Sequence, residues 1–345
     1  MLRELPAAAG QGLSAEELGE LVSRAIAPVV AHDGVRLDGT NPTLGTGPGA
    51  FGFWYGYEPS LSRALQHSYH AGDDPCLAED LARRPVPVGV IGTGGGDRRR
   101  DKLTRRLLTD HGAGCELRLL LRDARGVWGM LGLLRAQGDR PFDAGDAHRV
   151  ASLGPSLIAA LRGYVTAGPL APVIQALPAG VLLLGPDLEV SAVTPQALRW
   201  EEQLRGRENC PGWAREAFFV ELALRTRIHA RDPRTRPPVV YGPAVNYGRW
   251  MAFHGQVFDN DDGTGGVAIV IEAATGTRLL PAFCDWYAIT TRERQIITEL
   301  LDGAAAKRIA RRLDLSLHTV NDHLKKIFRK TGASGRDELV AAITG

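Results

Sequence analysis

Apolar and polar residues alternate with two different periods along the chain, and its first half contains both. Ser14 and Glu17 form a capping box, in which each side chain bonds the other residue's backbone N–H at a helix start. Apolar residues then recur every three or four positions, which predicts a helix. Farther on, the apolar runs 115–122 and 127–135 flank Asp-Ala-Arg-Gly and predict a β-hairpin. A helical pattern over 144–165 follows that hairpin.

The middle of the chain repeats this alternation after a Gly- and Pro-rich segment, 168–172, which we interpret as a linker. The strand patterns cover 182–193, 248–258 and 267–273, and the helical patterns cover 195–204 and 213–229. A Gly-Pro-Asp turn divides the first strand pattern, and the last two form a second predicted hairpin. This region is therefore expected to be an antiparallel sheet flanked by helices.

Three helices in close succession are predicted near the C-terminus. A second capping box, Thr290 with Glu293, begins the first helix, and Gly303 ends it. A short second helix covers 305–313, and after a three-residue turn Ser316 is a suitable N-cap for a third. Two short helices joined by a turn of this length predict a helix-turn-helix, whose second helix docks in the major groove of DNA.

The third of these helices has one apolar face and one polar face. At about 100° per residue, the inward face holds Val320, Leu324, Ile327 and Phe328. The residues expected to reach base edges are His318, Thr319, Asn321, Asp322 and Lys325. The residues expected to contact phosphates are Lys307, Arg308, Lys326, Arg329 and Lys330.

Asp322 is an acid among cations, and its position has two interpretations. A carboxylate can accept a hydrogen bond from a cytosine amino group, in which case Asp322 selects DNA sequence. Alternatively, Asp322 pairs with Lys325 or Lys326 at i+3 or i+4 spacing, a surface effect of about 0.2–0.5 kcal/mol. The sequence pattern leaves both interpretations open.

The charge of the chain is concentrated at its C-terminal end. The formal net charge is only +2, yet residues 285–345 contain eleven Lys and Arg against eight Asp and Glu. The region before them therefore carries a slight negative excess. A local positive footprint of this kind is typical of a domain with a phosphate-bearing partner.

Residues 289–343 closely resemble a LuxR-type helix-turn-helix, through ITTRE, KRIARRLDLS, HTVNDHLKKIFRKTGAS and GRDELV. The resemblance implies that Asn321, Asp322 and Lys325 face bases. Asn321 stands where the family usually has Lys or Arg, which puts the operator sequence in doubt. The resemblance also implies that the fourth helix supports dimerisation, through Leu339, Val340 and Ile343. The alternative is that this helix only closes the core of its domain.

Two further resemblances concern the rest of the chain. The hairpin, the Phe142-Asp143 turn and the long helix after it resemble the end of a GAF domain, and the stretch from Leu177 resembles the start of a PAS domain. The expected fold class is α+β: two antiparallel-sheet sensory domains, then an all-α tetrahelical domain. The expected boundaries are 1–167 (GAF-like), 168–276 (PAS-like), 277–288 (linker) and 289–345 (LuxR-type).

Aromatic residues are the candidates for a ligand-binding role in the two sensory domains. They are Phe53, Trp54, Tyr55, Trp128, Trp200 and Trp250. Packing of the core explains the same residues more simply. The sequence identifies no cofactor. It also predicts no metal site, because the spacing of His67, His70 and Cys76 matches no standard zinc pattern.

Several function classes lack their usual motifs. The chain contains no GxSxG or HExxH, so an enzyme is not expected. Its four cysteines form no disulfide framework, no apolar run reaches membrane-spanning length, and the N-terminus lacks the apolar centre of a signal peptide. These features predict a cytoplasmic protein.

The sequence therefore predicts a transcription regulator that binds a double-stranded DNA operator as a homodimer. Its N-terminal domains would sense an unidentified small-molecule effector or a protein partner, and RNA polymerase is a candidate partner. The alternative is a constitutive regulator whose N-terminal domains serve only oligomerisation and partner docking.

Overall fold

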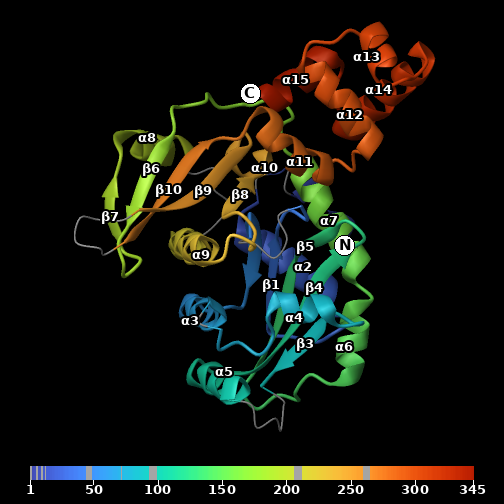
Figure 1. Ribbon diagram of the computed structural model, residues 1–345. Coiled ribbons are helices and arrows are strands. Elements are labelled where there is room, and N and C mark those ends of the chain that lie inside the picture. The colour runs from blue at the N-terminus through green and yellow to red at the C-terminus, as the bar shows by residue number, and fades with distance from the viewer. Residues whose placement is uncertain are drawn as a thin grey trace.

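The computed structural model describes residues 2–4, 7–8, 11, 13–43, 49–70, 72–92, 99–205, 212–258 and 265–345, without the side chains of residues 2, 70 and 212–214 (Figure 1). These residues form two five-stranded antiparallel sheets, each with helices, followed by an all-helical C-terminal region. The α+β architecture and the helical C-terminus predicted from the sequence are confirmed.

The first sheet and its helices, residues 2–166, are called here the N-terminal unit. Its strand order is β2-β1-β5-β4-β3, with α2 and α7 on one face and α3, α4 and α5 on the other. The elements are η1 (Leu2–Glu4), α2 (Ala15–Ile26), β1 (Gly34–Gly39), β2 (Phe51–Tyr55), α3 (Pro59–His70), α4 (Ala78–Arg83), β3 (Val88–Ile91), α5 (Arg99–Asp110), β4 (Ala113–Asp123), β5 (Gly126–Ala136), α6 (Ala144–Ala151) and α7 (Gly154–Thr166).

The two faces of this sheet differ because side chains alternate along each strand. Leu117 and Leu119 of β4 belong to the apolar core under α2 and α7. Glu116 and Arg118 alternate with them and lie on the opposite face, where both are almost completely buried. The sheet therefore has one apolar face and one that carries buried charges.

The buried charges form an ion-pair network around Arg118. Its Nη1 lies 2.7 Å from Oδ2 of Asp74, and its Nη2 lies 2.7 Å from Oε2 of Glu116. The Tyr57 hydroxyl donates a hydrogen bond to Oε1 of Glu116 at 3.0 Å. Burial is the largest single influence on the pKa of Glu116 and raises it, but the charges of Arg118 and Arg36 and the hydrogen bonds from Arg118 and Tyr57 together hold that pKa below its ordinary value. Each buried charge is thus matched by a partner, as burial requires.

The second sheet and its helices, residues 180–273, are called the central unit. Its order, β7-β6-β10-β9-β8, repeats that of the first sheet when strands are counted along each unit. The elements are β6 (Gly180–Leu184), β7 (Val190–Val193), α8 (Pro195–Leu204), α9 (Gly212–Arg231), β8 (Val239–Gly242), α10 (Ala244–Tyr247), β9 (Met251–Phe258) and β10 (Gly266–Ala273). Both hairpins predicted from the sequence are confirmed, as β4–β5 and β9–β10.

The C-terminal region contains five helices: α11 (Gly276–Trp286), α12 (Thr291–Leu301), α13 (Ala306–Arg312), α14 (Leu317–Thr331) and α15 (Arg336–Thr344). Helix α11 occupies most of the segment 277–288, which the sequence suggested as a linker. In Figure 1, α12 to α15 lie together at one end of the molecule, next to α11.

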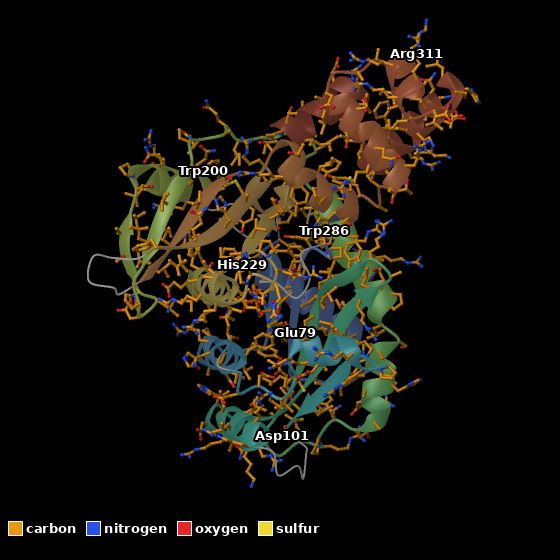
Figure 2. The ribbon with its side chains drawn as sticks, in the orientation of Figure 1. Glu79, Asp101, Trp200, His229, Trp286 and Arg311 are labelled. Atoms are coloured by element: carbon orange, nitrogen blue, oxygen red, sulfur yellow. The ribbon has the colours of Figure 1, made fainter. Side chains whose placement is uncertain are left out.

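Trp286, near the end of α11, joins the C-terminal region to the N-terminal unit. It is 1% exposed, and its ring lies 5.2 Å from that of Trp128 and 5.9 Å from that of Phe51 (Figure 2). Nε of Arg162 donates a hydrogen bond to its carbonyl oxygen at 3.3 Å. The helix that leads into the C-terminal domain is thereby packed into the core of the N-terminal unit.

Three local predictions require correction. The helix expected over 144–165 is two helices, α6 and α7. Pro155 lies in the first turn of α7, and the helix is interrupted just before it because proline cannot continue a helix from the preceding turn. Residues 60–83, whose sequence favours a single helix, also form two helices, α3 and α4. Helix α5 was not predicted, because its sequence is dominated by charged residues and it buries only Thr104 and Leu108.

Arg118→Met is expected to destabilise the N-terminal unit strongly. The substitution leaves the carboxylates of Asp74 and Glu116 buried without their cation, which costs about 3–5 kcal/mol. Calorimetry should record a melting transition lowered by roughly 6–20 °C. The control is Arg83→Met, which removes an ion pair in which Arg83 is 76% exposed and should change little. Equal effects from the two variants would contradict a structural role for the network.

Candidate nucleic-acid interface

The turn between α13 and α14 is set by local contacts. Asp314 has a φ of 52°, in the left-handed region that Asp tolerates better than most residues. The backbone N–H of Leu315 then bonds the carbonyl of Ala310 at 2.9 Å. Ser316 caps α14 by accepting from the N–H of Thr319 at 3.0 Å, as the sequence predicted. These contacts fix the direction in which α14 leaves the turn.

The inward face of α14 holds the domain together. Val320 and Ile327 are completely buried and join Ile296, Ile297 and Ile309 in the core. Leu324 and Phe328 are partly buried against the same cluster. The apolar face expected from helical periodicity is therefore confirmed, and the opposite face is left toward solvent.

Four of the five residues expected to read bases lie on that outer side. His318, Asn321 and Lys325 are exposed, and the Asp322 side chain is 45% exposed. Thr319 is half-buried, and its hydroxyl lies 2.9 Å from that of Ser316. Thr319 is therefore occupied in the helix cap.

Asp322 has a partner that the sequence analysis did not consider. Its Oδ2 lies 3.3 Å from Nε2 of His318, one turn earlier, and not beside Lys325 or Lys326. The contact is an ion pair when the imidazole is protonated and a hydrogen bond when that nitrogen carries a proton in the neutral ring. Either form orients the carboxylate on the outer face of α14.

The cations of this domain fall into two groups. Lys307, Arg308, Lys326 and Arg329 are exposed, and Arg311 of α13 extends outward at the far end of the domain (Figure 2). Lys330 is different. Its Nζ lies 2.5 Å from Oε2 of Glu293 and 2.9 Å from the carbonyl oxygen of Ala288. The predicted phosphate contact at Lys330 is therefore replaced by a contact inside the domain.

The fourth helix of the domain, α15, does not present the surface that was expected. Leu339 and Ile343 are completely buried within the chain, and Val340 is partly buried. Helix α15 packs against α11 and α12. The two buried residues close the core and leave no side-chain surface for a second copy, so the dimerisation role is withdrawn for them.

The aromatic candidates are divided in the same way. Phe53, Trp128, Trp200 and Trp250 are buried core residues, and Tyr55 is 41% exposed. Trp54 alone among the six lines the cavity of about 190 Å³ that lies between the N-terminal unit and α9. Sequence reasoning missed the polar residues of this cavity, Arg36, Asp38 and Ser62 among them. The signal for these cavity residues was the alternation of charged with apolar residues along one strand, as in Arg36-Leu-Asp38.

Metal ligation and membrane crossing can also be assessed in the described part of the chain. No group of three or more His, Cys, Asp or Glu side chains there is placed to hold a metal ion. His67 is exposed, and the side chain of His70 lies outside the described residues. No described helix combines the length and the hydropathy that crossing a membrane requires.

Comparison with known proteins identifies the C-terminal domain. Residues 288–343 match the family described as bacterial regulatory proteins, luxR family. A monoamine regulon transcriptional regulator of Klebsiella aerogenes is 49% identical over 53 residues, which are 15% of this chain and 23% of that protein. The chain thus covers under a quarter of that relative. The LuxR-type helix-turn-helix predicted for 289–343 is confirmed.

Glu293→Gln is expected to weaken the C-terminal domain and to flatten its dependence on pH. Burial raises the pKa of Glu293, but hydrogen bonds from Lys330 and Thr290 outweigh burial and lower it from 4.5. A carboxyl whose pKa is lower in the folded state than in the unfolded state stabilises the fold at pH values above its unfolded-state pKa. This stabilisation is lost as the pH falls through its folded-state pKa. The variant should lose about 1 kcal/mol at neutral pH.

Melting temperatures between about pH 3 and pH 6 test this expectation. The wild-type protein should lose stability more steeply than the variant as the pH is lowered. Parallel curves for the two proteins would mean that Glu293 does not titrate against Lys330.

Proposed function

We propose that this protein is a transcription regulator that binds double-stranded DNA through α14 and receives its input through the N-terminal and central units. The observation that carries the proposal is the outer face of α14, where polar and cationic side chains remain exposed on a LuxR-type helix-turn-helix. A helix of this kind places its outer face against base edges in the major groove. The excess of cations in the same domain supports the choice of nucleic acid as the partner.

The side chains of α14 divide into two roles in this proposal. Asn321, Asp322 and Lys325 contact base edges, because amide, carboxylate and ammonium groups match the donors and acceptors of the major groove. Lys326 and Arg329 contact phosphates, together with Lys307 and Arg308 of α13. His318 holds Asp322 in place, and Lys330 is left out of the interface because Glu293 engages it.

The two sheet units are proposed as input domains, GAF-like over 1–167 and PAS-like over 168–276, with the DNA-binding domain over 289–345. The cavity lined by Trp54 supports a sensory role for the first of them, because small-molecule sites are enclosed and largely preformed. In the alternative, both units are a scaffold for oligomerisation and protein docking. The edge strand β7 supports that alternative, because its exposed Val190 and Val193 offer an apolar surface to another protein.

A homodimer is proposed because two recognition helices about 34 Å apart reach successive major grooves. An input that changes this spacing would change operator affinity. RNA polymerase remains a candidate partner at the promoter.

Lys325→Ala and Lys326→Ala are each expected to weaken DNA binding and to reduce its salt dependence. Both substitutions remove a cation that faces the duplex, and loss of one phosphate contact, as at Lys326, lowers the slope of log affinity against log salt by about 0.9. A duplex selected from a random library supplies the probe, and fluorescence anisotropy between roughly 50 and 200 mM salt measures the slope. Because Lys325 is assigned to bases, its substitution should also alter sequence preference, unlike that of Lys326.

The matched control for these lysines is Lys330→Met, four residues after Lys326 on the same helix. It should lower the melting temperature, because Glu293 loses its cation, and leave the salt slope of the folded protein unchanged. If the Lys330 variant flattened the slope as Lys326→Ala does, the division between outward and inward cations would be wrong.

Asp322→Ala is expected to relax the preference at one base pair and to leave affinity at the other positions unchanged. Loss of an accepted hydrogen bond from cytosine removes about 1 kcal/mol of discrimination. Binding to a set of single-base operator variants measures the effect. His318→Ala serves as a companion, since it releases the carboxylate without removing it. A uniform change across all operator variants would show that Asp322 does not read a base.

A further inference from the structure

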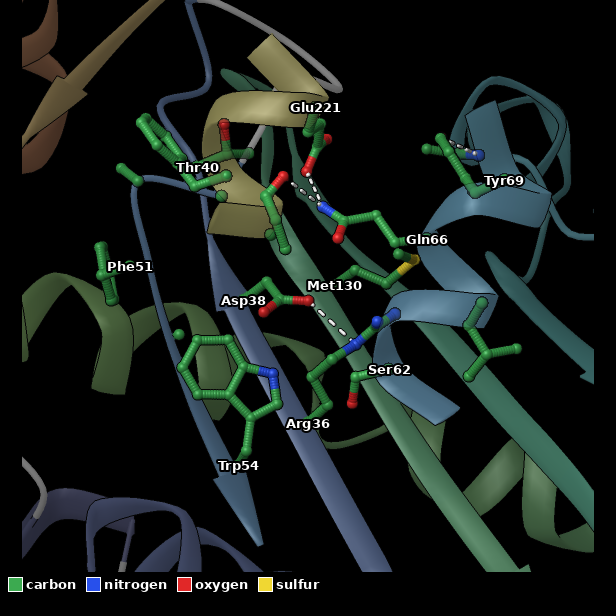
Figure 3. A pocket seen from close by; sticks show the side chains of 18 of the residues that line it. Arg36, Asp38, Thr40, Phe51, Trp54, Ser62, Gln66, Tyr69, Met130 and Glu221 are labelled. Atoms are coloured by element: carbon green, nitrogen blue, oxygen red, sulfur yellow. Dashed lines mark hydrogen bonds and ion pairs between the residues drawn. The ribbon is translucent and has the colours of Figure 1, made fainter. Parts of the chain in front are cut away.

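One wall of the cavity of the N-terminal unit is a helix that belongs to the other unit. Figure 3 shows Arg36 and Asp38 on β1, Gln66 on α3, and Glu221 of α9 across from them. Nε2 of Gln66 donates to Oε2 of Glu221 at 3.0 Å and to the carbonyl oxygen of Ala217 at 3.3 Å. Residues far apart in the sequence thus enclose a volume of about 190 Å³.

The floor of the cavity consists of two rows of side chains that run across the sheet. In the first row, Trp54 pairs with Arg36, and Arg36 pairs with Gly132. In the second row, Gly52 pairs with Asp38, and Asp38 pairs with Met130. Both rows lie on the face of the sheet that carries the Arg118 network. The strand register therefore places the row that contains Trp54 next to the row that contains Asp38.

The charges around the cavity do not cancel. Two acids, Asp38 and Glu221, and four arginines, Arg36, Arg118, Arg215 and Arg225, line it. The ion pairs of these residues bring in three further acids behind the lining, Asp74, Glu116 and Glu201. When all are ionised, one negative charge is in excess among these described residues. A buried charge without a counterion is costly, so the cavity favours a cation.

Asp38 is the acid in the best position to supply that excess charge. It lines the cavity, and its Oδ2 lies 3.1 Å from Nε of Arg36, which also lies 4.0 Å from Glu116. One guanidinium is therefore shared between two carboxylates. Burial raises the pKa of Asp38 to about 6, against the opposing effect of Arg36. The carboxyl is still largely ionised at neutral pH, and it lacks a full countercharge.

Two buried polar atoms in the wall point to a ligand independently of the charge. Oγ of Ser62 and Oδ1 of Asn246 line the cavity and have no hydrogen-bond partner, although their residues are only 4% and 5% exposed. Leaving such an atom unsatisfied costs about 1–3 kcal/mol. Both can accept a hydrogen bond, so a ligand that donates hydrogen bonds would satisfy them.

The remaining wall suits an apolar body of limited size. Trp54, Leu65, Met130, Phe218 and Phe253 all line the cavity. A cavity of roughly 150 Å³ accommodates benzene, so this one has room for a single ring with a short arm. Aromatic faces also attract cations.

We propose that this cavity binds a small organic cation, a protonated amine on a body of about one ring, between Asp38 of the N-terminal unit and Glu221 of the central unit. The inference rests on the proposed sensory function and specifies its ligand class. The ammonium donates to Asp38 and to the unsatisfied oxygens, and the ring packs on Trp54. Because α9 forms one wall, the occupant contacts both units.

The cavity also has a contiguous connection to the DNA-binding domain. Phe51 lines the cavity, and its ring lies 5.9 Å from that of Trp286. Trp286 ends α11, and α12 begins five residues later. An occupant that pushes or fixes Phe51 would therefore act on the helix that precedes the helix-turn-helix.

Three probes of similar shape and different charge test the ligand class on the full chain: phenethylamine, 2-phenylethanol and phenylacetate. Isothermal titration calorimetry measures affinity, and quenching of Trp54 fluorescence, identified with Trp54→Phe, reports the location. Phenethylamine is expected to bind at least about tenfold more tightly than the other two. Asp38→Asn and Glu221→Gln should each remove most of that preference, and the exposed control Asp110→Asn should not.

Ser62→Ala is a second test in case Asp38→Asn does not fold, because it removes only one unsatisfied hydroxyl. It should weaken phenethylamine binding several-fold. Tighter binding of phenylacetate or 2-phenylethanol, or binding of none of the probes, would overturn the proposed ligand class. DNA binding by the same preparations is measured separately. Failure there would count against the proposed function, whereas intact DNA binding without a preference for the amine would count only against this inference.

Discussion

The buried guanidinium of Arg118 is the constraint on which the rest of the N-terminal unit depends. It pairs with Asp74 and with Glu116 at 2.7 Å each, on the sheet face that also carries Arg36 and Asp38. Buried ions need specific partners and cannot be covered by close-packed aliphatic side chains. The helices on this face pack over two smaller apolar clusters and leave a space beside the network, and α9 of the central unit forms a wall of that space.

The same packing connects the cavity to the DNA-binding domain. Phe51 is one of the residues that line the cavity, and its ring packs near Trp286, which is also held by Trp128 and Arg162. The segment before the helix-turn-helix is thus a packed helix and not a free tether. A change in the cavity wall therefore has a short structural route to α12, whereas a flexible linker would carry no such change. The arrangement supports the function proposed above, in which an input alters how the DNA-binding domain is held.

Much of this fold could be predicted from the sequence because it depends on contacts between neighbouring residues. The capping boxes at Ser14 and Thr290 and the β4–β5 hairpin are all of this kind. The cavity could not be predicted, because it joins Asp38 to Glu221, which are brought together only by the packing of two units. Helix α5 was missed because charged residues dominate its sequence and few apolar residues mark its buried face. The alternation of charged residues with leucines at Glu116 and Arg118 was a usable sign of a charged sheet face. Because these residues lie within an apolar run, the whole run was interpreted as part of the core.

Lys326 and Lys330 show where helical periodicity reaches its limit as a guide to a nucleic-acid interface. They are four residues apart, which is about 40° around a helix, so periodicity assigns them to one face. Their environments nevertheless differ, because Lys330 lies at the end of α14 that packs beside Ala288 and Glu293. Glu293 in turn is the acid of the capping box that begins α12. A single ion pair thus joins the start of the first helix of the domain to the end of its recognition helix. One cation of the predicted interface holds the domain in shape, and its neighbours remain available to the duplex.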